Sequence, residues 1–270
     1  MSQPKLILLT NDDGIGSPGL WAAAGALEPL GQVVVAAPKN QCTSVGRSMP
    51  PGFSGRIETL TMTVNGRPHT AYAVDGTPAL AVQHALLELL PRAPDLVVAG
   101  INYGVNIGSG VTISGTIGAA LEAASWGLPA LAVSQDTDPR HHYSHSDEVD
   151  FSGAAHFTGY FAERLLALRL PPDVDILKVD VPLGATPQTA WAMTRVSRTR
   201  FYFPVKAARA DLSQPGPLGY RVQLEPDRVE ADSDVQAVAQ GLVAVSPLSL
   251  DLTSRVDLAG LARLVGAPRS

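Results

Sequence analysis

Two adjacent carboxylates, Asp12 and Asp13, follow a short apolar run over residues 5–9. Adjacent carboxylates repel each other unless a cation or a proton lies between them. With hydroxyl and amide oxygens from neighbouring loops, they would make an all-oxygen site suited to Mg²⁺ or Mn²⁺ rather than to zinc. The same Asp-Asp-Gly sequence is also an ordinary turn with a helix cap. The pair alone therefore allows two interpretations, a divalent-metal site and a structural turn.

A second group of residues could hold a phosphate. Ser114-Gly115-Thr116 stands where a small-residue helix over residues 115–126 is expected to begin, and a helix N-terminus offers free N–H groups and a positive dipole end to an anion. Upstream, Asn102 and Asn106 lie in a glycine-rich stretch that would let the backbone approach a ligand closely. Both asparagines could equally be turn residues, and Ser114 only a helix cap. A metal beside a phosphate seat indicates phosphoryl chemistry.

Two further clusters carry chemistry-bearing side chains. The run His141-His142-Tyr143-Ser144-His145 resembles a set of metal ligands, but acidic neighbours such as Asp147 are typical of a solvated loop. Three arginines within residues 195–200, followed by Phe201-Tyr202-Phe203, could stack a base and hold a phosphate. They could equally form a β-hairpin with one charged face.

Alternating strand and helix patterns supply the framework for these groups. Strands are predicted over residues 5–9, 32–37, 95–99 and 130–134, and helices over residues 18–31, 80–90, 115–126 and 151–168. Strands separated by helices predict βαβ units and a mostly parallel sheet in a three-layer α/β sandwich. Ligands bind such sheets at the carboxyl ends of the strands, where all the polar groups above would meet.

Other segments do not follow the alternation of strands and helices, and their patterns indicate elements added to the core. Residues 50–72 indicate a β-excursion, residues 191–223 a projecting hairpin or a small subdomain, and residues 252–265 a short terminal helix. We therefore expect a Rossmann-like catalytic core over residues 1–190. Residues 191–270 would form a β-hairpin extension and a C-terminal oligomerisation arm.

Composition narrows the class of partner and the compartment. A formal net charge of -5 over 270 residues argues against binding a nucleic acid polymer, which requires clustered positive charge. The single cysteine, Cys42, allows no internal disulfide and suits a reducing compartment. The N-terminal residues show no signal-peptide pattern, and no apolar run approaches the roughly 20 residues that span a bilayer. A cytoplasmic protein without a membrane partner is expected.

At this point the residues resemble the SurE family of stationary-phase survival proteins, which are 5′/3′-nucleotidases. The resemblance extends from Leu6 to about Leu252 and is most specific at its N-terminal motif. The matching segments are Thr10-Asn11-Asp12-Asp13-Gly14-Ile15, Ser17-Pro18-Gly19-Leu20, Val35-Ala36-Ala37-Pro38, Gly76-Thr77-Pro78, Gly100-Ile101-Asn102-Tyr103-Gly104, Ser114-Gly115-Thr116, Asp232-Ser233-Asp234 and Ser246-Pro247-Leu248.

The resemblance implies a metal-dependent phosphomonoesterase that hydrolyses nucleoside 5′-monophosphates, with 3′-monophosphates and short polyphosphate as further candidate substrates. It implies a homodimer or homotetramer in which a C-terminal arm, here Leu242 to Leu252, can exchange between subunits. One divalent metal per subunit would be bound by a ligand set that maps onto Asp12, Asp13, Thr43 and Asn102. The substrate phosphate would contact Asn11, Asn106, Ser114, Gly115 and Thr116.

The loop that carries Thr43 departs from the family pattern. Thr43 replaces the usual serine ligand and keeps the hydroxyl, while Ser44 next to it could take the role after a one-residue shift. Arg47 replaces a histidine and could add a phosphate contact.

We expect Asp12 and Asp13 to anchor the metal, and one of them could also accept the proton of the attacking water. Asn106, Ser114 and Thr116 would hold the phosphate oxygens as charge develops. A haloacid-dehalogenase-type phosphatase fits less well, because that family needs two carboxylates separated by one residue. A phosphoreceiver module would need an Asp where Asn102 stands and a Lys near Ser134, and neither is present.

Overall fold

The chain folds around one nine-stranded sheet in a computed structural model that describes residues 3–266. Its strands are ordered β3-β4-β2-β1-β5-β6-β7-β11-β8. The strands are β1 (Leu6–Thr10), β2 (Gln32–Pro38), β3 (Ile57–Val64), β4 (Arg67–Val74), β5 (Leu96–Tyr103), β6 (Ala130–Gln135), β7 (Ile176–Val181), β8 (Trp191–Met193) and β11 (Val243–Leu248). A separate antiparallel pair is formed by β9 (Tyr202–Val205) and β10 (Gly219–Val222).

Most neighbours in the sheet are parallel. The run from β4 through β2, β1, β5 and β6 to β7 pairs in parallel, while β3 is antiparallel to β4 and β11 is antiparallel to β7. The chain leaves β1 towards β2 on one side and returns as β5 on the other. Strand order therefore reverses between β1 and β5, the point where ligands bind in open α/β sheets.

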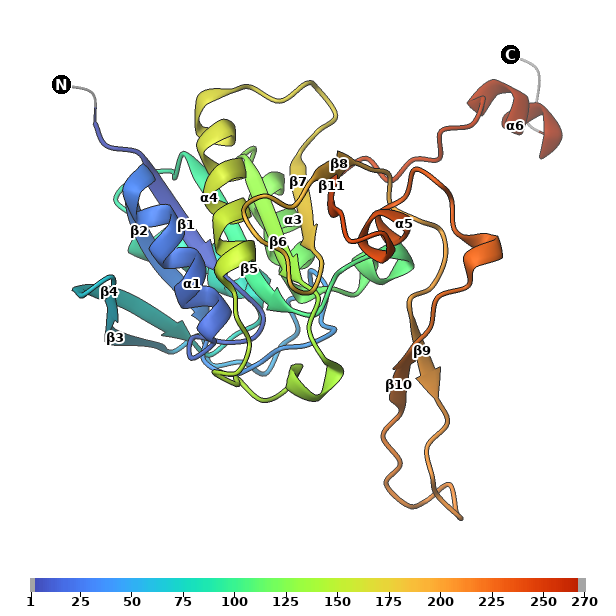
Figure 1. Cartoon of the computed structure of the whole chain (residues 1–270), viewed down its shortest axis with the longest axis horizontal. Helices are drawn as coiled ribbons and strands as arrows, with labels where there is room; N and C mark the ends of the chain where they lie inside the picture. The colour runs from blue at the N-terminus through green and yellow to red at the C-terminus, as the bar shows by residue number, and fades with distance from the viewer. Residues whose placement is uncertain (1–2, 267–270) are drawn as a thin grey trace.

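Helices cover both faces of the sheet and make the three predicted layers (Figure 1). The helices are α1 (Pro18–Leu27), α2 (Pro78–His84), α3 (Gly115–Ser125), α4 (Ser152–Ala167), α5 (Asp234–Ala239) and α6 (Leu258–Leu264), and a π-helical turn over Ala85–Leu89 extends α2. The pair α1 and α4 packs on one face, and α2 with α3 packs on the other. The predicted α/β sandwich is confirmed.

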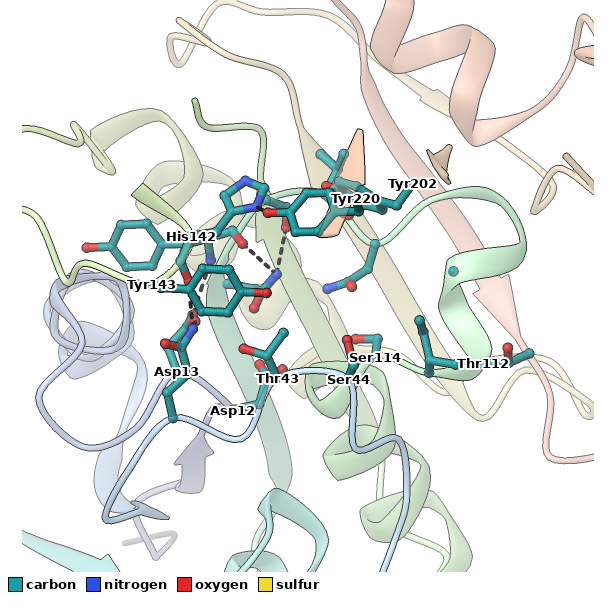
Figure 2. Close-up of a pocket in the computed structure, with 18 of the residues that line it drawn as sticks. Asp12, Asp13, Thr43, Ser44, Thr112, Ser114, His142, Tyr143, Tyr202 and Tyr220 are labelled. Atoms are coloured by element: carbon teal, nitrogen blue, oxygen red, sulfur yellow. Dashed lines mark hydrogen bonds between the residues drawn. The ribbon is translucent and has the colours of Figure 1, made fainter. Parts of the chain in front are cut away.

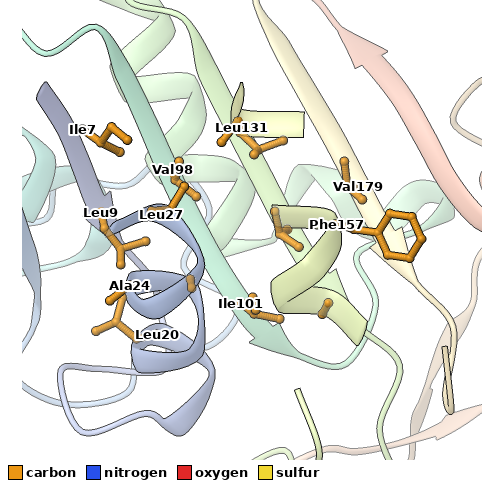
Figure 3. Close-up of a cluster of buried hydrophobic side chains, with 14 of the residues drawn as sticks. Ile7, Leu9, Leu20, Ala24, Leu27, Val98, Ile101, Leu131, Phe157 and Val179 are labelled. Carbon is orange, nitrogen blue, oxygen red and sulfur yellow. The ribbon is translucent and has the colours of Figure 1, made fainter. Parts of the chain in front are cut away.

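The core under α1 and α4 is built from large apolar side chains (Figure 3). Leu20 and Leu27 of α1 pack with Phe157 of α4 over Val98 and Leu131 of the sheet. Burying a side chain of this size contributes roughly 1.5–3 kcal/mol, so this layer holds the central strands firmly. The opposite layer uses smaller residues, mainly the alanines of α3, which let that helix approach the sheet and its loops closely.

Two strands of the sheet, β7 and β11, are not among the predicted ones. The sequence of β7 places Lys178 and Asp180 between apolar residues, which looks half-exposed, although all six residues are buried. The strand β11 falls within the segment Leu242 to Leu252 that was expected to form an exchanging arm, and it pairs with β7 and β8 of its own chain. Because β8 and β11 belong to the main sheet, that sheet crosses the boundary expected at residue 190.

The β9–β10 hairpin and the C-terminal segment with α6 project from the body of the molecule (Figure 1). The hairpin lies within the predicted projecting segment, and α6 lies within the predicted terminal helix. Over residues 3–266, no helix combines the length and apolar character needed to cross a bilayer.

Candidate functional site

The acidic pair stands at the carboxyl end of β1, the central strand between β2 and β5. A tight turn over residues 11–14 holds the pair in this position. Asn11 closes this turn with both ends of its amide, since its Oδ1 accepts from the Gly14 N–H at 3.1 Å and its Nδ2 donates to the Gly14 carbonyl at 3.0 Å. Gly14 has a φ of 95°, which suits glycine. Asn11 is fully buried and outside the cavity lining, so it holds the turn.

Asp12 is 5% exposed and packs against the start of α3. Its Oδ1 accepts a hydrogen bond from the hydroxyl of Thr116. A methyl group at Gly115 would come within 2.7 Å of Asp12 Oδ2, so only glycine fits there. Burial raises the pKa of Asp12 to about 6, although the hydrogen bonds from Thr116 and Gly115 oppose that rise.

Asp13 is 2% exposed and contacts the loop after β2 and the end of β5. Its Oδ1 accepts from Gln41 Nε2 and its Oδ2 from the Tyr103 N–H, each at 3.1 Å. Burial and the charge of Asp12 raise the pKa of Asp13 well above its usual value. No Lys or Arg within the described chain forms an ion pair with Asp12 or Asp13. Two buried carboxylates without a cation of their own fit a divalent metal ion.

Asn102 fits the oxygen-rich ligand set. A register shift between Ala99 and Asn102 interrupts the pairing of β5 with β6 just before this residue. The Asn102 Nδ2 donates to the carbonyls of Tyr103 and Gly104 at 3.2 and 2.6 Å, which leaves its Oδ1 available as a ligand. Carboxylate, amide and hydroxyl oxygens are the donors that Mg²⁺ and Mn²⁺ prefer.

The loop after β2 brings both Thr43 and Ser44 to the cavity. The Cys42 N–H donates to the Asp12 carbonyl at 2.7 Å and fixes the start of the loop beside the acidic pair. Figure 2 draws both residues at the cavity together with Asp12 and Ser114. Either hydroxyl is therefore available to the site, and Thr43 as the ligand stays a prediction.

Arg47, for which a phosphate contact was expected, lies outside the cavity lining. Its Nε instead donates to Glu122 Oε2 of α3 at 2.8 Å. Glu122 is buried and also accepts from Gln83 and Trp126. Beside this ion pair, a Cβ at Gly118 would meet the Gly46 carbonyl oxygen at 2.2 Å. Arg47 therefore fastens the Thr43 loop to α3.

The start of α3 lies at the cavity as predicted. Ser114 caps the helix, since its Oγ accepts from the Ile117 N–H at 3.1 Å, and it also lines the cavity. Gly115 and Thr116 are buried behind it and contact Asp12. Asn106 lines the cavity, and its Nδ2 donates to Ser134 Oγ at 2.8 Å. The expected phosphate residues are thus brought together, with Thr116 directed at Asp12 and Asn11 set apart.

An aromatic wall closes the other side of this cavity, which has a volume of about 510 Å³. The rings of His142 and Tyr220 stack at 6.1 Å with 13° between their planes, and Tyr202 meets Tyr220 edge-on at 5.5 Å. In Figure 2 these rings lie across the cavity from Asp12 and Asp13. Pocket-lining residues of the wall are His142, Tyr143, Arg200, Tyr202, Pro204, Gly219 and Tyr220.

The wall contains residues that sequence reasoning placed differently or missed. His142 was interpreted either as a metal ligand or as part of a solvated loop, and not as a wall of the cavity. No group of three or more His, Cys, Asp or Glu suited to a metal occurs among residues 3–266. Arg200 and Tyr202 line the cavity, whereas Arg195 pairs with the exposed Asp232. Tyr220 carried no signal, because only the pairing of β10 with β9 brings it to the site.

Comparison with known proteins gives consistent matches. The family model described as Survival protein SurE matches residues 7–202. The 5′-nucleotidase SurE of Methanothrix thermoacetophila is 41% identical over 261 residues, covering 94% of this chain and 96% of that protein. The 5′-nucleotidase SurE of Thermococcus gammatolerans is 40% identical, covering 93% of this chain and 92% of its own length. The crystal structure of the SurE protein from Aquifex aeolicus matches with a TM-score of 0.75 at 29% identity, covering 96% of this chain and 99% of that one.

Proposed function

The chain belongs to the SurE survival-protein family, and from this premise we propose that it is a metal-dependent nucleotidase that hydrolyses nucleoside monophosphates to nucleoside and inorganic phosphate. The observation that carries the proposal is the buried pair Asp12 and Asp13, which has no cation partner in the described chain and opens on a cavity beside the N-terminus of α3. The relatives named 5′-nucleotidase SurE support the 5′-monophosphate as the substrate.

Four side chains would hold one divalent metal per subunit, with Mg²⁺ or Mn²⁺ favoured by the all-oxygen set: Asp12, Asp13, Thr43 and Asn102. When bound, such an ion supplies a nucleophilic water at neutral pH and neutralises phosphate charge. Gln41 and the Tyr103 N–H keep Asp13 oriented, and Thr116 keeps Asp12 oriented. Hydrogen bonds of this kind hold a carboxylate ligand in one geometry.

The phosphate would lie between the acidic pair and the start of α3. Asn106 can donate its remaining amide hydrogen, and the hydroxyl hydrogen of Ser114 is free because its oxygen serves as the cap acceptor. Donors fixed in this way stabilise the negative charge that develops on the phosphoryl oxygens without reorganising. Their anchoring by neighbouring elements is the reason to assign them this role.

The nucleoside would lie against the aromatic wall. The hydroxyl of Tyr202 donates to the Val105 carbonyl at 3.1 Å, and that of Tyr220 is 2.7 Å from His142 Nδ1. Because the hydroxyls of Tyr202 and Tyr220 already have partners, these two residues offer ring faces for stacking more than hydrogen bonds to a base edge. We therefore propose that the base is held by stacking against these rings.

Assembly and compartment are part of the proposal. We propose a homodimer or homotetramer built with the C-terminal arm, and a reducing compartment in keeping with the free thiol of Cys42. The haloacid-dehalogenase and phosphoreceiver alternatives are set aside, because the family match and the adjacent carboxylates support neither.

Replacing Asp12 by Asn tests the proposed function directly. The change removes an anionic ligand, so we expect turnover of adenosine 5′-monophosphate and Mn²⁺ affinity both to fall about 100-fold or more. Phosphate release and isothermal titration calorimetry measure the two effects. Asp227→Asn, at an exposed position far along the chain, is the matched control and should behave as the wild type. Near-wild-type turnover in Asp12→Asn would refute the metal site.

A further inference from the structure

Three fully buried charged side chains lie behind the cavity and take no part in the proposed chemistry. Lys178 and Asp180 belong to β7, Asp234 begins α5, and each is 0% exposed. The Lys178 ammonium donates to Asp180 Oδ2, and to Asp234 Oδ2 at 3.0 Å. Burying charges is costly even when they are paired, and apolar residues can often replace them without loss of stability. If this cluster has a role besides stabilising the fold, the groups that form hydrogen bonds with its carboxylates should indicate that role.

Asp180 and Asp234 bind backbone amides from two separate segments. Asp180 Oδ1 accepts from the Asn106 N–H at 2.7 Å, and Asp234 Oδ2 accepts from the Gly108 N–H at 3.2 Å. Asp234 Oδ1 accepts from the Ser197 N–H at 2.9 Å. The first segment carries the phosphate-side residue Asn106. The second leads within a few residues to Arg200 and Tyr202 of the aromatic wall.

The two segments also contact each other directly. The Ser109 N–H donates to the Thr199 carbonyl at 2.8 Å. Gly108 has a φ of 59°, and a Cβ on it would lie 2.5 Å from the Thr199 oxygen. Because the two segments are closely packed at Gly108 and Thr199, neither can move without displacing the other.

The charge of Lys178 favours its contacts with Asp180 and Asp234. Burial lowers the pKa of Lys178, but the nearby carboxylates of Asp180 and Asp234 outweigh that effect and hold it above its ordinary value. Burial raises the pKa of Asp180, although the charge of Lys178 opposes that rise. The protonated Lys178 is therefore the group that joins Asp180 and Asp234.

We propose that Lys178 is a positioning residue: it holds Asp180 and Asp234 together, and so sets the distance between the phosphate side of the cavity at Asn106 and its aromatic side at Arg200 and Tyr202. The inference rests on the proposed function, because it assigns the two sides to the two ends of one nucleotide. It concerns residues that contact neither metal nor substrate.

The test uses the full chain with Lys178→Met, which keeps the length of the side chain and removes its charge. We expect hydrogen exchange at the Asn106 and Gly108 amides to accelerate about tenfold or more, because their acceptors are no longer held together. The KM for adenosine 5′-monophosphate should rise about fivefold or more, since the two sides no longer match one substrate. Mn²⁺ affinity should not change, because Asp12 and Asp13 lie outside the cluster. Lys5→Met, which breaks the exposed ion pair of Lys5 with Asp95, is the matched control.

Unchanged amide exchange together with an unchanged KM in Lys178→Met would overturn the proposal. So would a lower yield of active enzyme with wild-type KM, because that is the signature of a purely structural role. If Lys178→Met does not fold, the double variant Lys178→Met/Asp180→Asn removes one positive and one negative charge and is judged by the same two measurements. Failure of the wild type to release phosphate would count against the proposed function alone, since the exchange measurement still decides the role of Lys178.

Discussion

Three asparagines in the catalytic half of the chain serve three different purposes. Asn11 closes a turn with both ends of its amide, Asn102 fixes its nitrogen and leaves its oxygen available, and Asn106 faces the cavity. The residue types at the strand ends were sufficient to predict an oxygen-rich site. They could not show which polar atoms are already used, because that depends on partners such as Gly14 and Gly104 that meet them only in the fold.

Thr43 and Ser44 give a prediction about a single hydroxyl. Thr43→Val is nearly isosteric and removes only the oxygen, so metal affinity and turnover should fall about tenfold or more. Thr43→Ser keeps the donor and should be close to neutral. Ser44→Ala should change little. Calorimetry with Mn²⁺ decides: a damaging Ser44→Ala beside a tolerated Thr43→Val would move the ligand by one residue.

The hydroxyl of Thr116 should act on Asp12. Thr116→Val removes the hydrogen bond to Asp12 Oδ1, and loss of such a supporting contact typically weakens metal binding about 10–100-fold. Thr158, a fully buried threonine of α4 that donates to the Ala154 carbonyl, provides the control Thr158→Val. Metal titration of both variants should show weakened binding for Thr116→Val only. Equal affinities would assign Thr116 to packing alone.

Elements with a clear apolar period were predictable, and those shaped by distant partners were not. The periods of β1, β2, α3 and α4 carry their own signal, and the sheet edge that bears the site follows from them. The strand β7 was missed because Lys178 and Asp180 resemble solvent-facing residues until Asp234 joins them. Only part of the aromatic wall could be predicted. The sequence indicated Tyr202 but not Tyr220, because the two meet only through the register of β9 with β10.

The β9–β10 hairpin should contribute to binding of the nucleoside and not of the phosphate. Tyr220→Ala removes a stacking face, so the KM for adenosine 5′-monophosphate should rise about tenfold, the weight of one stacked base. The KM for ribose 5-phosphate, which has no base, should stay the same. Tyr220→Phe keeps the ring and loses only the contact to His142, so it should resemble the wild type. A parallel rise for both substrates would place the hairpin at the phosphate instead.

The C-terminal third of the chain contributes one buried strand to the sheet and then continues as an exposed segment. The residues Val243, Ala244 and Val245 of β11 are fully buried between β7 and β8. Beyond Leu248 the chain leaves the sheet, and its apolar side chains become exposed, with Leu252 at 90% and Leu264 at 82%. We therefore propose that the oligomerisation arm predicted from the resemblance comprises the residues after the sheet and not β11.

Truncation at two points separates these parts. Removing all residues after Leu250 keeps β11 and the hydrogen bond from the Leu250 N–H to Asp175, so the subunit should fold and retain its metal site. It removes the exposed apolar residues of the arm, which need a covering surface, and the light-scattering mass should shift towards a smaller assembly. Removing all residues after Gly241 also deletes β11 and should unfold the subunit, which thermal melting would show as the loss of a cooperative transition. A folded Leu250 truncation with the mass of the full-length assembly would refute the arm as an interface.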